Sequence, residues 1–328
     1  MNALGNVYCL IRLCVLMLII TSSHVLNAQD TPTQPDTNNV DFIIFSHDRP
    51  LQLYALLESA AVHLTGLRSV HVIYRTSSAD YERAYDELKH VFIDVDFLQQ
   101  KDPPHDFKQL VMQALTTAGD YLMFAVDDQI VKDAVDLSYC VSMLEKTGAY
   151  GFYLELGDHL DQFYELQFLA AYNVPPYKVP PLSLVQDDVC TWQFCTGIYH
   201  WNYPHMMDTV IYRTPDIVAC ATPLAFNSPN SFEIALGGNT HHLRTSYGLC
   251  FKNSKTLNTP LNVVQHDYNA NAMIDYPAQK LFEHFCNGLK IDVTPFFGLR
   301  NRATHIEWQP NFVSRDKSVK FLLRIRDI

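Results

Sequence analysis

The chain has 328 residues, of which 48% are hydrophobic and 18% are charged, so disorder is excluded as its main state. It carries 35 acidic and 24 basic side chains, and the net charge of −11 argues against general binding to nucleic acid, which needs cationic groups. Eight cysteines are too few for a small domain held together by disulfides. The composition therefore indicates a globular enzyme or binding domain.

The N-terminal residues have the pattern of a secretory signal. Arg12 precedes an unbroken apolar run, Leu13–Ile20, a polar patch follows, and Ala28 offers a small side chain for cleavage. The run is well short of the roughly 18 apolar residues that span a bilayer. We expect residues 1–28 to be a signal peptide or a signal anchor, so that the protein is secreted or anchored by its N-terminus in the secretory pathway. Residues 29–40 are polar and contain prolines, as a flexible tether does.

Apolar runs alternate with segments of helical periodicity between residues 40 and 126. The expected strands are Val40–Phe45, Val70–Arg75, Val91–Val95 and Tyr121–Val126, and the expected helices cover residues 50–66, 77–89 and 107–119. We expect Ser77 and Asp80 to cap the second helix. The last strand is apolar on both faces, as a central parallel strand is. This alternation predicts an α/β fold with a central, mostly parallel sheet, in which ligands bind beyond the carboxyl ends of the strands.

The second half of the chain is less regular. Short strands are expected at Gly151–Leu154 and Thr209–Arg213, and aromatic side chains are frequent between residues 152 and 203. Aromatic faces stack on sugars but fill an ordinary core equally well, so the sequence leaves both interpretations open. Because no clean linker separates the halves, we expect one domain over residues 41–328.

Six cysteines would remain after removal of residues 1–28. The pair closest in sequence, Cys190 and Cys195, could form a disulfide in an oxidising compartment, whereas buried free thiols fit the sequence equally well. No further His or Cys surrounds this pair at a suitable spacing, which argues against zinc.

Two acidic residues, Asp127 and Asp128, directly follow the most apolar strand. At the ligand-binding edge of the sheet, a hard divalent cation such as Mg²⁺ or Mn²⁺ would relieve their repulsion and could bridge to a diphosphate. The alternative is that Asp127 caps a turn and Asp128 is solvated. Glycine-rich dinucleotide and P-loop motifs, the Gly-x-Ser-x-Gly elbow and the His-Glu-x-x-His motif do not occur in the sequence.

Three segments together resemble a known family. The stretch Phe42–Pro50, the strand end Tyr74–Arg75 and the segment Phe124–Asp128 are similar to nucleotide-sugar glycosyltransferases of the A-type fold, in particular those of family 2. The resemblance implies a single Rossmann-like domain whose first half, 41–150, binds the nucleotide and whose second half, 151–328, binds the acceptor. Gln129 stands where the family often has a second, spaced acid, which is a departure from its metal-binding motif.

The resemblance also implies roles for residues of the nucleotide-binding half. Ser46, Asp48 and Arg49 would contact the base or the ribose, and Arg75 would contact the base or a phosphate. The alternatives are that Asp48 caps the following helix and that Arg49 is solvated.

The cation would be held by the acidic pair, and His305 is a candidate third ligand because imidazole suits Mn²⁺ better than Mg²⁺. His266 is another candidate. Glu233 lies in a largely apolar stretch where burial would raise its pKa, and it is the candidate base that takes the proton of the acceptor hydroxyl in an inverting transfer. The rival pair is Asp187 and Asp188, so that Asp188 is a second catalytic candidate.

The sequence therefore predicts a transferase that uses Mn²⁺ or Mg²⁺, a nucleotide-sugar donor and a glycan, protein or lipid acceptor. Nucleotide sugars occur mainly in the cytosol and in eukaryotic secretory lumens, so the signal fits this prediction if it anchors the protein in a Golgi-type membrane. The alternative is a non-catalytic secreted domain that binds a glycan or a nucleotide on the same fold. A metal-dependent phosphodiesterase is a third interpretation.

Overall fold

The computed structural model describes residues 40–163, 176–238, 240–264, 276–316 and 318–324, all of which fall in one compact unit. The expected signal segment and the tether up to residue 39 lie outside the described residues. Val40, which the sequence placed both at the end of the tether and at the start of the first strand, begins that strand. Within the described ranges, every helix is too short or too polar to cross a bilayer.

The first half of the main sheet consists of four parallel strands. β1 (Val40–His47) lies between β3 (Leu67–Arg75) and β5 (Tyr121–Val126), and β4 (Asp96–Gln99) pairs with the other side of β3. The expected strands at β1, β3 and β5 are confirmed. β5 is apolar at every position, as a strand buried on both faces requires, whereas β1 and β3 combine apolar runs with a few polar residues.

The expected strand Val91–Val95 is wrong. The preceding helix continues to Val91, and the strand begins only at Asp96. Phe92 is fully buried, and its ring packs edge-on against Tyr54 with the centroids 5.2 Å apart. The apolar residues therefore pack the end of a helix against the core. Periodicity alone does not distinguish such a segment from a short strand.

Three helices connect the parallel strands: α2 (Pro50–His63), α3 (Ala79–Val91) and α4 (Phe107–Thr117). α2 begins with a proline in its first turn, where the missing N–H has no helical partner to lose. The N-cap of α3 is Ser78 rather than the expected Ser77, and its hydroxyl accepts from the backbone N–H of Tyr81 at 3.4 Å.

The main sheet continues from β5 into the second half of the chain. The further strands, in spatial order, are β11 (Val210–Arg213), β8 (Gly151–Tyr153), β12 (Tyr247–Phe251), β10 (Val189–Gln193) and β9 (Ser183–Gln186). Only β11 and β10 run against the direction of β1 in this nine-stranded sheet. The predicted α/β class with a central, mostly parallel sheet is therefore confirmed.

Smaller elements surround the main sheet. The two-stranded sheets pair β2 (Leu64–Thr65) with β7 (Val135–Asp136), β6 (Gln129–Val131) with β13 (Thr256–Asn258), and β14 (Leu289–Ile291) with β15 (Phe312–Ser314). The remaining α-helices of the described ranges are α5 (Leu137–Thr147), α7 (Thr214–Ala221), α8 (Pro229–Gly237) and α9 (Ala278–Cys286).

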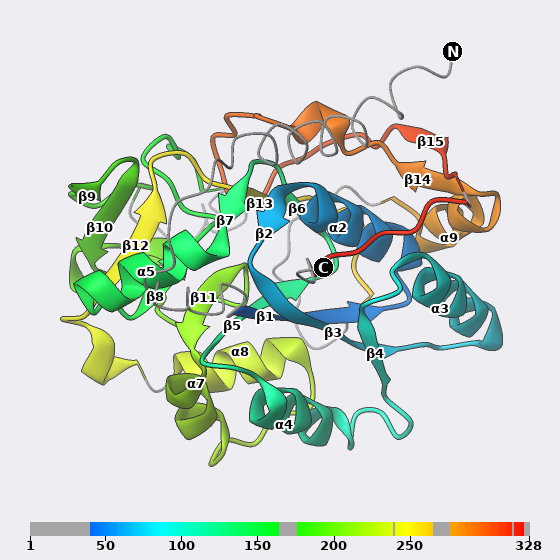
Figure 1. Ribbon diagram of the computed structural model, residues 1–328, viewed down its shortest axis with the longest axis horizontal. Helices are drawn as coiled ribbons and strands as arrows, with labels where there is room; N and C mark the ends of the chain where they lie inside the picture. The colour runs from blue at the N-terminus through cyan, green and yellow to red at the C-terminus, as the bar shows by residue number, and fades with distance from the viewer. Residues whose placement is uncertain (1–39, 164–175, 239, 265–275, 317, 325–328) are drawn as a thin grey trace, which may run out of the picture. The chain divides into compact units, whose positions relative to one another are not determined.

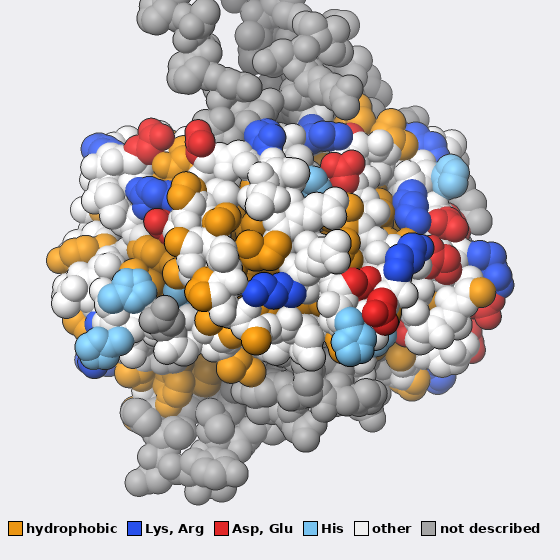
Figure 2. All heavy atoms as spheres, turned by 90° about the horizontal axis from the view of Figure 1, so that it is seen from below, with side chains coloured by type: hydrophobic (Ala, Val, Ile, Leu, Met, Phe, Trp, Pro, Cys, Tyr) orange, Lys and Arg blue, Asp and Glu red, His pale blue; other side chains and the backbone are white. Residues whose placement is uncertain are grey.

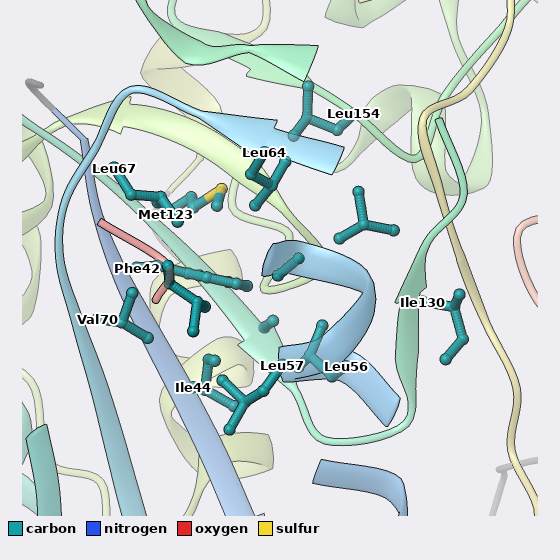
Figure 3. Close-up of a cluster of buried hydrophobic side chains, with 14 of the residues drawn as sticks. Phe42, Ile44, Leu56, Leu57, Leu64, Leu67, Val70, Met123, Ile130 and Leu154 are labelled. Atoms are coloured by element: carbon teal, nitrogen blue, oxygen red, sulfur yellow. The ribbon is translucent and has the colours of Figure 1, made fainter. Parts of the chain in front are cut away.

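The core lies on both faces of the main sheet. Along β1, Phe42 and Ile44 point into one hydrophobic cluster together with Leu56 and Leu57 of α2 (Figure 3), whereas Ile43 and Phe45 point into the other. The first cluster also includes side chains of α3 and α5. The second cluster includes side chains of α4, α7 and α8, which lie below the sheet in Figure 1. Figure 2 shows that lower side, where basic, acidic and apolar side chains are interspersed over the described surface.

All six cysteines of the described residues are free. Cys190 is buried on β10 directly opposite Cys250 of β12, whereas Cys195 is exposed. The thiols are therefore free, as in the second alternative, but only Cys140, Cys190 and Cys250 are buried.

Candidate functional site

The order of the strands identifies the edge at which a ligand site is expected. The chain leaves β1 toward β3 and β4 on one side, and then returns to β5 on the other side. Ligands of open α/β sheets bind beyond the carboxyl ends of the strands at this point of reversal. The loops after β1 and β5 meet there, so that the residues after His47 and those after Val126 become neighbours although about 80 positions separate them.

Arg49 joins the two loops. Its Nη1 donates to Asp127 Oδ1 and to Asp128 Oδ2, each at 3.0 Å, and its Nη2 donates to the backbone carbonyl of Asn262. Burial alone would lower the pKa of Arg49, but attraction to the two carboxylates outweighs burial and raises it. The alternative of a solvated Arg49 is therefore wrong, because its guanidinium bridges the acidic pair.

Asp127 is held on its other side by β1. Ser46 Oγ donates to Asp127 Oδ2 at 2.8 Å, and the backbone N–H of His47 reaches the same oxygen at 3.3 Å. The hydroxyls of Ser46 and Tyr85 lie 2.5 Å apart, which extends the network to α3. Burial, with repulsion from Asp128, raises the pKa of Asp127 to about 6 against the opposing attraction of Arg49.

One of the two carboxylate oxygens of Asp128 has no hydrogen-bond partner among the described residues. Its backbone carbonyl accepts from both the N–H and the hydroxyl of Thr259, at 2.9 and 3.0 Å, which fixes the turn after β5. Its Oδ1 is buried and has no hydrogen-bond partner among the described residues. The alternatives are both wrong: the Asp127 carboxylate accepts from Ser46, His47 and Arg49 rather than capping its own turn, and the Asp128 side chain is only 11% exposed.

The loops after β1 and β3 form the neighbouring part of the edge. Asp48 has a positive φ of 53°, and its Oδ1 accepts from the backbone N–H of Ser77 at 2.9 Å. Arg75 Nη2 lies 3.1 Å from His47 Nδ1. Asp48 therefore ties two loops together and does not cap α2, whose N-cap has no side-chain hydrogen bond. The structure thus brings all four predicted nucleotide-contacting residues to one edge.

A second group of polar residues surrounds Glu233 on α8. The backbone N–H of Met207 donates to Glu233 Oε1 at 3.1 Å. Burial, together with repulsion from Asp208, raises the pKa of Glu233 to about 8, although Met207 and His305 act in the opposite direction. The acid that the sequence selected therefore has a raised pKa, as its apolar sequence surroundings predicted.

Gln129 connects the two groups. It follows Asp128 directly, is fully buried, and its Nε2 donates to Asp208 Oδ1 at 2.8 Å. Sequence reasoning missed Asp208 and this contact of Gln129. The sequence carries no signal for either, because the contact joins residues 79 positions apart.

The backbone beside Asp208 is strained. Thr209 is buried and has a φ of 51°, which a β-branched residue rarely adopts. Its N–H donates to the carbonyl of Phe124 at 2.8 Å, and its hydroxyl lies 2.6 Å from that of Thr256. These bonds hold the strained residue in place, and with it the position of Asp208, which lies just before β11 begins.

The remaining candidates fall in different places. His305 forms a β-bridge with Asn258, and its charge acts on Glu233, so it lies on the side of the second group. Asp188 lies in the turn between β9 and β10, and β10 is four strands away from β5. His266 lies outside the described residues. Among the described residues, no three His, Cys, Asp or Glu side chains gather as a metal-binding group would.

No known protein family and no curated protein matches the chain. Among solved structures, S. aureus TarS 1-349 matches with 13% identity and a TM-score of 0.40, over 65% of this chain and 58% of that one. The same protein in complex with UDP matches with 14% identity and a TM-score of 0.39, over 65% of this chain and 60% of that one. Its complex with UDP-GlcNAc matches with 14% identity and a TM-score of 0.38, again over 65% and 58%. The chain thus spans less than two thirds of these structures.

Proposed function

We propose that the chain is a glycosyltransferase that moves a sugar from a nucleoside diphosphate donor to a hydroxyl group. The observation that supports the proposal is the pairing of two different groups at one edge of the sheet. One is the charged cluster around Arg49, Asp127 and Asp128, and the other is a carboxyl group, Glu233, with a raised pKa. The bond between Gln129 and Asp208 fastens the two groups together.

The donor would lie across the ends of β1, β3 and β5. In this proposal Ser46 and Asp48 face the base or ribose, and Arg49 and Arg75 supply positive charge for the phosphates. Two guanidinium groups suit this task because they offer forked donors to phosphate oxygens. Arg75 is the last residue of β3 and Arg49 follows the end of β1, and these two strands are paired side by side.

The divalent cation belongs to this proposal as well. The donor set fits a hard cation, because both ligands are carboxylates and Asp128 Oδ1 is buried without a partner. Asp127 and Asp128 would hold Mn²⁺ or Mg²⁺, which would neutralise the leaving diphosphate. His305 stays a proposed third ligand, and its position beside Glu233 makes it the less direct one.

The acceptor hydroxyl would lose its proton to Glu233. A carboxyl with a pKa near 8 is a strong base once ionised. Asp208 and Gln129 then act as positioning residues: Gln129 orients Asp208, whose negative charge keeps the pKa of Glu233 high. Asp188 is the rival base, and its distance from β5 places it second.

The acceptor class and the location are proposed on the sequence alone. A glycan, protein or lipid hydroxyl would serve as acceptor, and residues 1–28 would direct the protein to the secretory pathway or anchor it to a membrane.

The experiment that tests the function measures nucleoside diphosphate released from a panel of nucleotide sugars. We expect the wild type to release it and Asp128→Ala to lose that activity. Binding of nucleoside diphosphates without release would favour the non-catalytic binding domain. Turnover of phosphodiesters that carry no sugar would favour the phosphodiesterase.

A further inference from the structure

We propose that Arg49 is the resident counter-ion of Asp127 and Asp128, and that a divalent cation can bridge the pair only by displacing its guanidinium. This inference concerns the control of cation binding. It takes its role from the proposed function, but the cation alone suffices to test it.

The guanidinium of Arg49 and a bridging cation would occupy the same position. A single atom, Arg49 Nη1, lies 3.0 Å from an oxygen of each carboxylate. A cation that bridges two carboxylates has to occupy the place where their oxygens converge, and that place is filled by this nitrogen. The guanidinium is also held by a further contact, because its Nη2 donates to the backbone carbonyl of Asn262.

Asp127 offers a cation no oxygen other than the one that Arg49 contacts. Its Oδ2 already accepts from Ser46 Oγ and lies within reach of the backbone N–H of His47. Only Oδ1 remains for a cation, and Arg49 holds that oxygen. Asp128 differs, since its Oδ1 is buried and has no hydrogen-bond partner in the described structure. A cation could therefore touch Asp128 alone with Arg49 in place, but it could bridge both acids only after Arg49 has left.

The charges explain why the exchange is feasible. Two ionised carboxylates and one guanidinium leave a net charge of −1, which still attracts a cation into a buried place. A divalent cation in place of the guanidinium would bring that charge to zero. The released Arg49 would then be available to the phosphates of a donor, so that cation binding and donor binding support each other.

The test is a calorimetric titration of the full chain with MnCl₂ and no nucleotide. We expect Arg49→Ala to bind Mn²⁺ at least about tenfold more tightly than the wild type, which corresponds to about 1.4 kcal/mol. Adding Asp128→Asn to that variant should abolish the gain. Equal affinity in wild type and Arg49→Ala would overturn the proposal, and so would an Arg49→Ala variant that folds and binds no Mn²⁺.

Arg68→Ala is the matched control. Arg68, on β3, pairs with the buried carboxylate of Asp41 on β1 at 2.8 Å, at the opposite end of the parallel strands from Arg49 and without a second acid. Its removal should leave Mn²⁺ binding unchanged, and a gain equal to that of Arg49→Ala would contradict the proposed site.

Arg49→Lys keeps the inference testable if the alanine variant does not fold. An ammonium group lacks the fork that lets Arg49 hold two acids and the carbonyl of Asn262 together, so we expect tighter Mn²⁺ binding than in the wild type. An unchanged affinity of a folded lysine variant would speak against displacement. Because neither titration involves a sugar donor, a failed transferase assay and a failed cation titration are separate results.

Discussion

The most specific prediction concerns Glu233, because its environment would set the pH dependence of the proposed transfer. Burial and the charge of Asp208 raise its pKa to about 8. A base acts only when it is ionised, and with this pKa the ionised fraction is about 1% at pH 6, about 9% at pH 7 and about 50% at pH 8. We therefore expect kcat/KM to rise about ninefold from pH 6 to pH 7, and about fivefold more to pH 8.

The assay is nucleoside diphosphate release at varied acceptor concentration across this pH range, which yields both kcat/KM and kcat. Glu233→Gln should lower kcat by roughly 10² to 10⁴, because the amide cannot take a proton. Asp208→Asn should leave the base in place but move the inflection to lower pH by on the order of one unit, because it removes a negative charge that raises the pKa of Glu233.

Asp188→Asn is the control for the same assay. It removes the rival base from the turn between β9 and β10, and we expect no change in rate or in pH profile. A profile that is flat between pH 6 and pH 8, or activity lost in Asp188→Asn and kept in Glu233→Gln, would refute the assignment of the base.

Two further predictions concern the donor edge and the core. Arg75→Ala should weaken nucleoside diphosphate binding roughly tenfold by calorimetry, whereas Arg68→Ala, at the opposite end of the parallel strands, should not. Gly248→Ala should lower the free energy of unfolding by about 1–3 kcal/mol in a urea titration, since the new methyl group would lie 2.5 Å from the buried ring of Trp192. Gly238→Ala, whose nearest contact would be 3.6 Å, should be close to neutral, and equal losses in both variants would contradict the packing argument.

The parallel half of the sheet could be predicted because its signals are local. β5 is apolar at each position, and both of its ends match the sequence-based expectation. β4 could not be placed, because the apolar residues before it end a helix and pack on Tyr54, a contact between distant segments. The strands β9, β10 and β12 are short and were not expected, since their order in the sheet follows from tertiary pairing rather than from a repeated pattern.

In the candidate site, too, the parts that depend on local signals could be predicted and the contacts between distant residues could not. The end of β1 and the end of β5 could be selected because the edge of a parallel sheet is known once its strands are known. The ion pairs of Arg49 could not, because 78 positions separate it from Asp127. Asp208 could not be predicted, because its place in the site depends on its hydrogen bond with Gln129 and on the strained backbone of the residue that follows it.

The most direct test of the proposed function is the release of nucleoside diphosphate from a nucleotide sugar, followed in parallel for the wild type and for Asp128→Ala. We expect release by the wild type at a rate that Asp128→Ala lowers by at least about a hundredfold, with the variant still folded. A folded wild type that neither binds nucleoside diphosphates nor releases them, or an Asp128→Ala variant as active as the wild type, would contradict a donor site at the ends of β1 and β5.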